Sequence, residues 1–476
     1  MYNNEPKERV YGWGRTTFSN SMVYRPSSII QIHSIIEDAK KRKLKITCRG
    51  SGRSYGDNTL NSNQIVLDIS EMNKILSWDK ETGLIVAESG ATIEKIILKC
   101  VPDGWLFPSM PGTRFVSLAG ALGNNVHGKN EFHRGCIGEY VQSFDAILAD
   151  NKLYTCSRDK NVELFYSIIS GIGLLGVIVN VSINLRKIPS YYVNGNVKKN
   201  KNFKELIEEY ETIKGDFEYS IAWIDAIKSG KGLGRGEINF GNLINDNDYT
   251  IHDHEIPKRL SIGISNDFVP LITKRILNAH TMKLVNWLQI NLGSMSSDVQ
   301  KTKVSLSKYH YLMDMKFPKY NFFFKHGFFE YQAILPIQFC IKGFEELLKI
   351  THKYKFYSLM SSLKAYRNQK EDFLLHFPLE GFSMTMDIPK EENKISQQVK
   401  MFFEMNEKVI EYGGRINFGK TPILNLEHFE NMYPNSKEFI NIKNKYDPDY
   451  LFESNMFRRI MNITREGCEV PSIYSI

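Results

Sequence analysis

Residues 45–58 of the chain read KITCRGSGRSYGDN, a short strand-like stretch that runs directly into a glycine-rich loop. Lys45–Cys48 favours a strand, and the loop at 49–57 contains Gly50, Gly52 and Gly56. Backbone amides at the end of a strand can form a concave anion site, and glycines let the main chain approach a phosphate without side-chain collision. The stretch is therefore a candidate phosphate-binding loop, although for one glycine loop alone an ordinary turn is the favoured interpretation.

Two common phosphate-binding loops are excluded by the glycine spacing. Gly50-x-Gly52 followed by Gly56 does not fit G-x-G-x-x-G, and no Gly-Lys-Ser/Thr follows. A second loop cluster at 108–129 contains Gly112, Gly120, Gly123 and Gly128. Two separate small-residue loops, both at strand ends, indicate a ligand that is long, planar and phosphorylated.

The flanking sequence predicts a mixed α/β unit around these loops. Apolar residues recur at helical spacing from residue 29 to 39, behind a capping serine. Strands are expected at 65–68, 84–88, 144–149 and 153–156, the last two forming a hairpin around Asp150-Asn151. The stretch 167–185 carries no charge, but its second half alternates between apolar and polar residues, which predicts a half-buried strand and excludes a spanning helix.

Composition excludes several classes of protein. The 476 residues are 42% hydrophobic and 24% charged, which rules out a mostly disordered chain, and the net charge of +8 is mild. That charge suits an anionic ligand or an acidic membrane surface and does not demand nucleic acid. The 6 scattered cysteines contain no CxxC pair, which indicates free thiols in a reducing compartment and no metal site. The polar N-terminus shows no secretory signal, so we expect a cytoplasmic protein.

A change of composition divides the chain. Between Ser190 and Lys204 the sequence becomes rich in Lys and Asn, which predicts a linker at a domain boundary. The stretch 241–308 shows few clear periods and is expected to include mobile or lid-like segments. A helix is expected to end at Gly413-Gly414, followed by a strand at 415–418 and a helical segment that reaches Asp447-Pro448.

Several motifs, in the same order along the chain, resemble the PCMH-type FAD-binding domain of the vanillyl-alcohol oxidase superfamily. They are the loop at 49–57, Pro111-Gly112-Thr113, His127-Gly-Lys129-Asn130 and the glycine turn at 171–176. Four more resemble, within that superfamily, the oxidases of polyprenyl-phosphoryl ribose: the segments 12–16, 222–225, 331–336 and 413–420. The resemblance implies an α+β flavoprotein with a FAD-binding domain at 1–190, a substrate domain with an antiparallel sheet at 191–412, and a segment at 413–476 that completes the flavin domain.

The resemblance also implies the residues that contact FAD. The pyrophosphate would be wrapped by Cys48, Arg49, Gly50, Ser51, Gly52, Arg53, Ser54, Tyr55, Gly56, Asp57 and Asn58. The rest of the cofactor would be lined by Gly112, Ser117, Leu118, Ala119, Gly120, Asn124, Asn125, Val126 and His127, with Ile178 at the adenine end and Asn417 at the active-site end. Because Arg53 stands about where covalent members attach the flavin through a histidine, non-covalent FAD is expected.

Lys420, His127 and Tyr55 are the catalytic candidates that the resemblance implies, and Lys129, Gln332, Lys364 and Thr385 are the substrate candidates. Without the resemblance, these side chains would be interpreted as surface lysines, a satisfied loop histidine and a packing tyrosine. The sequence leaves open whether Lys420 or His127 is the base. Thr385 and Asn417 differ from the residues that the family has at these places, which leaves the exact sugar and lipid open.

The implied reaction is oxidation of a secondary sugar hydroxyl to a ketone, with FAD accepting the hydride. By resemblance, the substrate is a polyprenyl-phosphoryl-β-D-ribose oxidised at its 2′-hydroxyl, and a separate NAD-dependent reductase would complete the ribose-to-arabinose epimerisation. Membrane contact would then be peripheral and led by the substrate, since no amphipathic anchor is evident. Two alternatives stay open: a soluble sugar-alcohol or aldonolactone oxidase, and a basic nucleic-acid- or membrane-binding protein without flavin.

Overall fold

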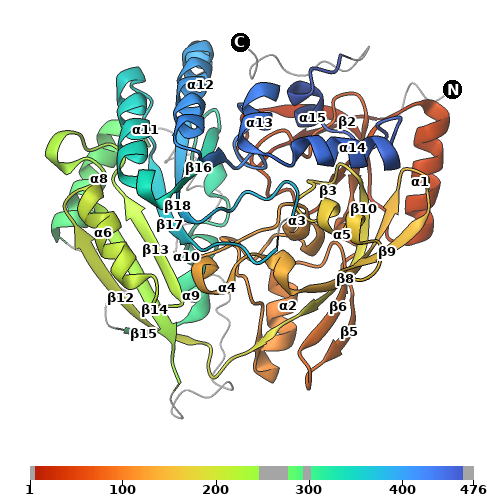
Figure 1. Ribbon diagram of the computed structural model, residues 1–476, viewed down its shortest axis with the longest axis horizontal. Coiled ribbons are helices and arrows are strands. Elements are labelled where there is room, and N and C mark those ends of the chain that lie inside the picture. The colour runs from red at the N-terminus through yellow and green to blue at the C-terminus, as the bar shows by residue number, and fades with distance from the viewer. Residues whose placement is uncertain (1–5, 246–276, 293–301, 372, 465–476) are drawn as a thin grey trace.

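The computed structural model of the chain describes residues 6–245, 277–292, 302–371 and 373–464. It has the α+β architecture expected from the sequence, with mainly antiparallel sheets in two groups (Figure 1). The first group is a four-stranded sheet in the order β1 (Glu8–Tyr11), β2 (Phe18–Tyr24), β4 (Ile65–Asp68), β3 (Ile46–Arg49), and a five-stranded sheet in the order β5 (Ile75–Asp79), β6 (Leu84–Glu88), β10 (Gly176–Asn184), β8 (Val141–Leu148), β9 (Leu153–Ser157). A two-stranded pair joins β7 (Trp105–Leu106) to β11 (Arg186–Lys187).

The second group is one eight-stranded sheet. Its order is β15 (Thr302–Ser305), β12 (Tyr192–Asn200), β14 (Gly236–Leu243), β13 (Tyr219–Ile224), β17 (Met360–Tyr366), β18 (Gly381–Pro389), β16 (Phe328–Pro336), β19 (Arg415–Ile416). Three helices, α6 (Phe203–Ile213), α11 (Cys340–Tyr354) and α12 (Ile395–Glu411), pack against it. Tyr331 points toward these helices, because its ring stacks on Phe402 and its hydroxyl donates to Asn406 Oδ1 at 3.1 Å. Side chains alternate along a strand, so Glu330 and Gln332 point to the other face.

The remaining helices are short, belong to the first group of sheets or, in the case of α8, lie against the large sheet. They are α1 (Ile29–Arg42), α2 (Ile93–Cys100), α3 (Leu118–Gly123), α4 (Glu131–Arg134), α5 (Val162–Ile168), α8 (Ala279–Leu292), α9 (Leu306–His310), α10 (Leu312–Lys316), α13 (Leu426–Met432), α14 (Ser436–Tyr446) and α15 (Asn455–Ile460). Figure 1 shows α13–α15 beside the N-terminal strands and away from α6 and α11. The C-terminal segment therefore returns to the first group of sheets.

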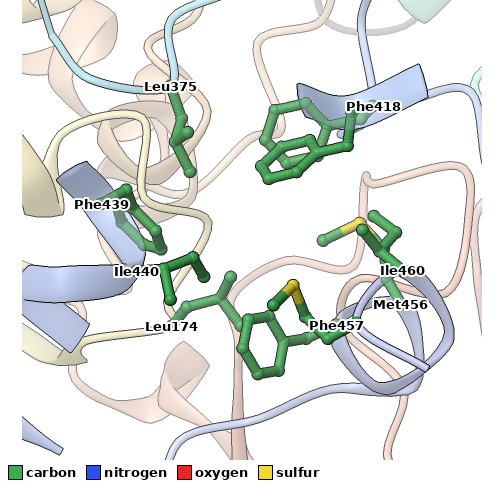
Figure 2. A pocket seen from close by; sticks show the side chains of 10 residues that line it. Leu174, Leu375, Phe418, Phe439, Ile440, Met456, Phe457 and Ile460 are labelled. Carbon is green, nitrogen blue, oxygen red and sulfur yellow. The ribbon is translucent and has the colours of Figure 1, made fainter. Parts of the chain in front are cut away.

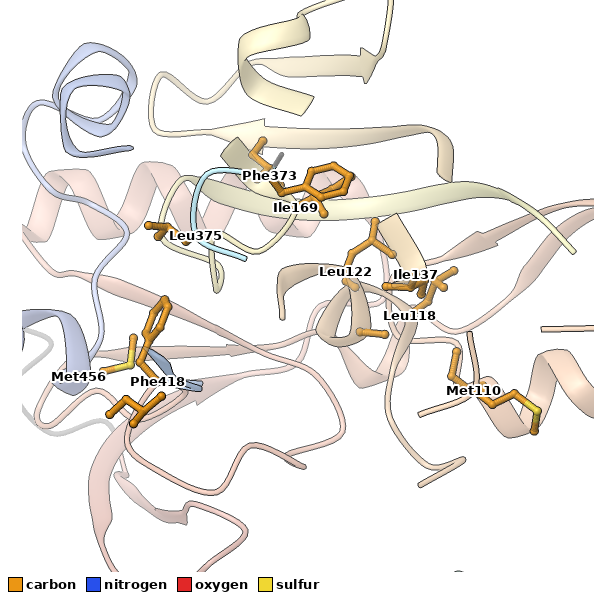
Figure 3. Close-up of a cluster of buried hydrophobic side chains, with 14 of the residues drawn as sticks. Met110, Leu118, Leu122, Ile137, Ile169, Phe373, Leu375, Phe418 and Met456 are labelled. Carbon is orange, nitrogen blue, oxygen red and sulfur yellow. The ribbon is translucent and has the colours of Figure 1, made fainter. Parts of the chain in front are cut away.

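The contact between the C-terminal segment and the N-terminal unit is apolar and close-packed. Phe439, Met456 and Phe457 surround a cavity of only about 10 Å³ together with Leu174, which precedes β10 (Figure 2). Figure 3 shows that Phe418 and Met456 belong to the same buried cluster as Leu118 and Leu122 of α3. Burial of apolar surface is the main stabilising term in folding, so this packing fixes residues 413–464 against the glycine loops. The division of the chain at 190 and 412 stays a proposal, which this packing supports.

Several local predictions from the sequence are confirmed. The Asp150-Asn151 hairpin joins β8 to β9, with Asn151 in the left-handed region at φ 68°. The alternating stretch is β10, and its apolar residues are buried. Ser28 caps α1 by accepting from the Gln31 amide, and Gly413 follows α12 at φ 65°.

Other predictions about segments are wrong or fall outside the described residues. The Lys- and Asn-rich stretch 190–204 is not a linker, because most of it is β12, which pairs with β14 and β15 inside the large sheet. The strand expected at 415–418 is limited to Arg415–Ile416. Most of the expected mobile or lid-like stretch at 241–308 lies outside the described residues, and its described parts include the end of β14, α8 and β15.

Candidate active site between the glycine loops and the large sheet

One face of the eight-stranded sheet collects the polar side chains. Paired residues of neighbouring antiparallel strands point to the same side. Gln332 of β16 lies opposite Thr385 of β18, and Lys364 of β17 lies opposite Ser383, so all four side chains share the face opposite α12. We call it the site face. It brings together three of the four predicted substrate residues, Gln332, Lys364 and Thr385.

Lys420 reaches this face from the turn after β19. Its Nζ donates to Glu330 Oε1 at 2.5 Å and lies 5.5 Å from the centre of the Tyr55 ring. Glu330 and Lys420 form an ion pair on this face. Asp387 is paired with Glu330 across β16 and β18, and burial together with the nearby Glu330 charge holds the pKa of Asp387 well above its usual value. Two carboxyl groups, Glu330 and Asp387, therefore lie together next to Lys420.

His127 is held by a chain of hydrogen bonds that crosses the site face. The Asn417 amide donates to Gln332 Oε1 at 3.0 Å, and Gln332 Nε2 lies 3.4 Å from the Tyr366 hydroxyl. That hydroxyl lies 2.8 Å from His127 Nδ1. Burial, with the charges of Lys364 and Lys420, holds the pKa of His127 well below its usual value, so the imidazole is neutral near pH 7.

Two lysines from different parts of the chain, Lys364 and Lys420, act on this histidine, and a third, Lys129, acts on Lys364. Burial lowers the pKa of Lys129 to about 8 and that of Lys364 to about 7, the latter helped by the positive charge of Lys420. Lys129 Nζ donates to the Tyr309 carbonyl at 2.8 Å. Among the described residues, no hydrogen bond or ion pair of Lys364 is found. Partly desolvated amines of this kind favour an anionic ligand, which would restore their charged form.

The two glycine loops lie side by side. Ser51 Oγ accepts from the Ser117 amide at 2.8 Å, and a Cβ on Gly50 would lie 1.9 Å from Ser117 Oγ, so only glycine allows this approach. Ser117 precedes α3, and the first residues of this helix, Leu118, Ala119 and Gly120, lie within the second loop cluster. The structure therefore brings together the two loops that the sequence singled out.

Two features of these loops fit a bound ligand. Asn58 is buried at the end of the first loop, yet among the described residues neither atom of its side-chain amide has a hydrogen-bond partner. A Cβ built on Gly112 would meet no protein atom within 4 Å, although the residue stands next to the bridge between Pro111 and Gly128. An orphaned buried amide and an open space beside the loops are what a long, polar and planar cofactor requires.

The side chains of other predicted cofactor residues are bound to groups of the protein itself. Asp57 forms a buried ion pair with Arg459 at 2.9 Å, and Arg49 donates to Thr59 and to the Tyr11 carbonyl. Arg53 lies over the Trp13 ring at 4.0 Å. These side chains support the shape of the first loop, so a contact with a cofactor would come from their backbone.

The remaining predicted residues are less closely tied to the site. Cys48 donates to the Gly176 carbonyl at 3.6 Å, and Ile178 is buried in β10. Asn124 caps α3 locally by donating to the Gly120 carbonyl, and Asn125 accepts from the Gly138 amide. Val126, Ser54 and Gly56 belong to the same two loops. Ile178 is the predicted residue for which the structure gives least support.

Sequence reasoning missed Glu330, Asp387, Tyr366 and Tyr320. The Tyr320 hydroxyl lies 2.7 Å from the Tyr55 hydroxyl, and both rings pack against Phe328. A polar residue at every second position of β16, Glu330 and Gln332 in an otherwise apolar strand, is a signal that could have pointed to a site on one face. The described residues contain no His, Cys, Asp and Glu cluster able to hold a metal ion. In the same part of the chain, no helix is both long and apolar enough to cross a bilayer.

Comparison with known proteins points to one family. Residues 21–157 match the family described as FAD binding domain, and residues 271–460 match D-arabinono-1,4-lactone oxidase. Decaprenylphosphoryl-beta-D-ribose oxidase of Mycolicibacterium smegmatis is 27% identical over 461 residues, which cover 95% of this chain and 97% of that protein. L-gulonolactone oxidase of Mus musculus is 20% identical over 94% of this chain and 97% of that protein, and D-arabinono-1,4-lactone oxidase of Yarrowia lipolytica is 27% identical over 44% and 40%.

The matched family models describe FAD binding and lactone oxidation, and the relatives are named for oxidation of sugars or sugar lactones, which agrees with the paired glycine loops and the polar site face. A flavin-free binding protein is thereby excluded as the alternative. The chain is a FAD-dependent oxidoreductase acting on sugar CH–OH groups, and it is similar to oxidases of the vanillyl-alcohol oxidase superfamily.

Proposed function

We propose that this oxidoreductase oxidises the 2′-hydroxyl of a polyprenyl-phosphoryl pentose, with ribose as the first sugar to test. The observation that carries the proposal is a group of three lysines beside one neutral histidine: Lys364 and Lys420 act on His127, and Lys129 acts on Lys364. A phosphate diester satisfies such a group, whereas a neutral lactone does not. The similarity to decaprenylphosphoryl-beta-D-ribose oxidase over nearly the whole length of both chains supports the same substrate class.

FAD would be held non-covalently by the two glycine loops, with Asn58 available to its polar backbone and the space beside Gly112 available to its planar part. When bound, FAD supplies the chemistry of the reaction by accepting the hydride that leaves the sugar carbon. The side chains of the chain then have two tasks. They orient the sugar, and they remove a proton from the hydroxyl while stabilising negative charge.

His127 is the better candidate for the proton acceptor. Its imidazole is neutral, and the Tyr366 hydroxyl lies 2.8 Å from Nδ1 and 3.3 Å from Nε2, so the unprotonated ring nitrogen would be the one to accept the proton. Lys420 is paired with Glu330 and is suited to stabilise charge as an ammonium. Tyr55, between Lys420 and Tyr320, would close one side of the sugar site.

The ketone formed in this reaction would need a second enzyme to reach the inverted alcohol. Hydride from a reduced nicotinamide, delivered to the opposite face of the carbonyl, would give the arabino configuration. We therefore propose a separate NAD-dependent reductase as the functional partner. A pull-down of the reductase activity by this chain, or coupled epimerisation by the two proteins, tests the partnership.

Gly112→Val is expected to weaken FAD binding while the fold persists. No protein atom lies within 4 Å of the new Cβ, and the backbone of Gly112 is not in the left-handed region, so the protein alone tolerates the side chain. If FAD occupies that space, overpacking costs roughly 1–3 kcal/mol, which weakens binding about ten- to hundredfold. Flavin absorbance per protein, with melting temperature as the fold readout, measures the effect.

Gly215→Val is the matched control, since Gly215 is also exposed and its Cβ would also meet no atom within 4 Å. Full flavin occupancy in both variants would show that the space beside Gly112 is not a cofactor site. Gly52 is a poorer test, because its φ of +66° and the 2.3 Å approach of Arg49 Nη2 would strain any side chain there.

Acid or heat precipitation is expected to release FAD into the supernatant. Arg53 occupies the loop position at which an attachment histidine would be expected, and its guanidinium lies over Trp13. Yellow colour that remains with the denatured protein would show a covalent bond, with His127 and Cys136 as the first residues to examine.

The lysine group predicts how kcat/KM depends on pH. Above about pH 7, Lys364 loses its charge, so kcat/KM for a phosphorylated substrate should decrease with rising pH. The limiting slope of this decrease is ~10-fold per pH unit. The charged groups that act on Lys364 are Lys420, Glu330, Glu131 and Lys129. Lys364→Met should give a lower kcat/KM whose basic limb begins only near pH 8, where Lys129 loses its charge, and an unchanged profile in this variant would remove Lys364 from the phosphate site.

The substrate class is tested by turnover with three compounds: a polyprenyl-phosphoryl ribose, the corresponding dephosphorylated ribose, and an aldonolactone. An artificial electron acceptor and the same enzyme preparation serve all three. We expect the phosphorylated compound to have by far the highest kcat/KM. Preference for the lactone would favour instead the lactone oxidase activity named by the family match at 271–460.

A further inference from the structure

Helix α8 buries polar side chains and exposes apolar ones, which is the reverse of an ordinary surface helix. Asn286 and Gln289 are buried, with exposed fractions of 3% and 7%, whereas Leu284 and Leu288 are 59% and 39% exposed. Trp287, 48% exposed, lies beside them. A surface helix of a globular protein normally turns its apolar stripe inward, so this arrangement requires another explanation.

The polar side of α8 is fixed to the large sheet. Asn286 Nδ2 donates to Asp225 Oδ1 at 2.7 Å, directly after β13, and Gln289 Nε2 donates to Glu237 Oε2 on β14 at 3.3 Å. Lys199 of β12 donates to the Ile290 carbonyl at 2.8 Å near the end of the helix. The orientation of α8 is therefore set by two buried hydrogen bonds, to Asp225 and Glu237, and by one exposed hydrogen bond from Lys199.

The same contacts place α8 on the site face. Glu237 is paired with Trp223, Trp223 with Ser362, and Ser362 with Thr385, so their side chains point to one side of the sheet. Met282, at the start of α8, packs against the small apolar cluster of Phe324, Phe328 and Leu359, whose rim includes Tyr55. A continuous set of apolar contacts therefore connects α8 with Tyr55, whose ring lies next to Lys420.

We propose that the exposed apolar side of α8, formed by Leu284, Val285, Trp287 and Leu288, binds the surface of an anionic lipid bilayer. This docking surface rests on the proposed function, because it would place the site next to the membrane that holds a polyprenyl substrate. Apolar residues with an interfacial tryptophan suit insertion into the headgroup boundary.

The charge of α8 favours an anionic bilayer as the binding partner of this surface. The helix contains no acidic residue, and Lys283, which is exposed, lies directly before Leu284 of the apolar side. Lysines at the edge of an inserted apolar face attract acidic headgroups. The net charge of +8 acts in the same direction at longer range.

The test is flotation of the FAD-loaded protein with vesicles, without substrate. The wild type should float with phosphatidylglycerol–phosphatidylcholine vesicles and less with phosphatidylcholine alone. The double variant Leu284→Gln/Leu288→Gln should bind these vesicles at least roughly tenfold more weakly than the wild type, since it loses both central apolar side chains. Leu76→Gln/Leu98→Gln is the matched control, because these leucines of β5 and α2 are 52% and 50% exposed and should not affect flotation.

Absence of flotation by the wild type, or equal loss in both double variants, would overturn the proposal. Sedimentation that shows a wild-type dimer which only the α8 variant dissociates would assign the surface to a second copy of the chain and would also overturn it. Turnover of a short, water-soluble prenyl-phosphoryl ribose should be equal in wild type and α8 variant. Failure of that turnover in both would contradict the proposed function and leave the vesicle result standing.

Discussion

Lys420→Met is expected to retain FAD and to slow substrate-driven bleaching of the flavin band by ~10²–10³. The ammonium of Lys420 lies on the site face beside Tyr55, paired with the buried Glu330. As hydride leaves the sugar, the hydroxyl oxygen loses its proton and develops negative charge, which this preorganised cation would stabilise. Met keeps the length of the side chain without its charge. Anaerobic stopped-flow absorbance measures the bleaching rate.

Lys353→Met is the control for loss of a lysine, because Lys353 pairs with Glu404 on the helices that cover the other face of the sheet. It should bleach at the wild-type rate. If Lys420→Met also does so at full FAD occupancy, Lys420 has no role in the chemistry. The carboxyl pair of Glu330 and Asp387 would then be a structural feature of the sheet.

His127→Ala is expected to slow the same step by about 10²-fold, the usual contribution of a positioned general base. Because the pKa of His127 lies well below its usual value, the wild-type rate should fall only at acid pH, where the imidazole takes up a proton. The variant should lose this acid limb, and added imidazole should restore part of the rate by entering the space that His127 vacates.

Tyr366→Phe provides the comparison, since it removes the hydroxyl 2.8 Å from Nδ1 and leaves the imidazole in place. We expect a smaller loss and a retained acid limb. A wild-type pH profile in His127→Ala would show that the proton leaves by another route, with Lys420 as the remaining candidate.

The sequence predicted those parts of the fold and site that depend on short-range signals. Gly50 and Gly112 lie in loops next to strand signals, and the spacing of the glycines excluded other phosphate loops. The alternation in β10 showed burial on one side without any tertiary information. These features follow from backbone freedom and side-chain periodicity, which a single segment carries by itself.

What the sequence did not reveal depends on pairing between distant segments. Glu330 and Asp387 meet because β16 and β18 pair in one register, and nothing in either strand alone indicates that partner. The sequence predicts a linker at 190–204 because the stretch is rich in Lys and Asn, whereas in the structure β14 and β15 pair with it and hold it inside the large sheet. The sequence does not indicate how α8 is placed, because the partners of its buried Asn286 and Gln289 lie on distant strands.

The most direct test of the central claim is anaerobic mixing of the FAD-loaded enzyme with polyprenyl-phosphoryl ribose, followed by analysis of the sugar. We expect the flavin band to bleach, and a keto-pentose phosphate, oxidised at the 2′ carbon, to appear in an amount equal to the flavin reduced. An unchanged flavin band with this substrate, together with rapid bleaching by an aldonolactone, would contradict the proposed function.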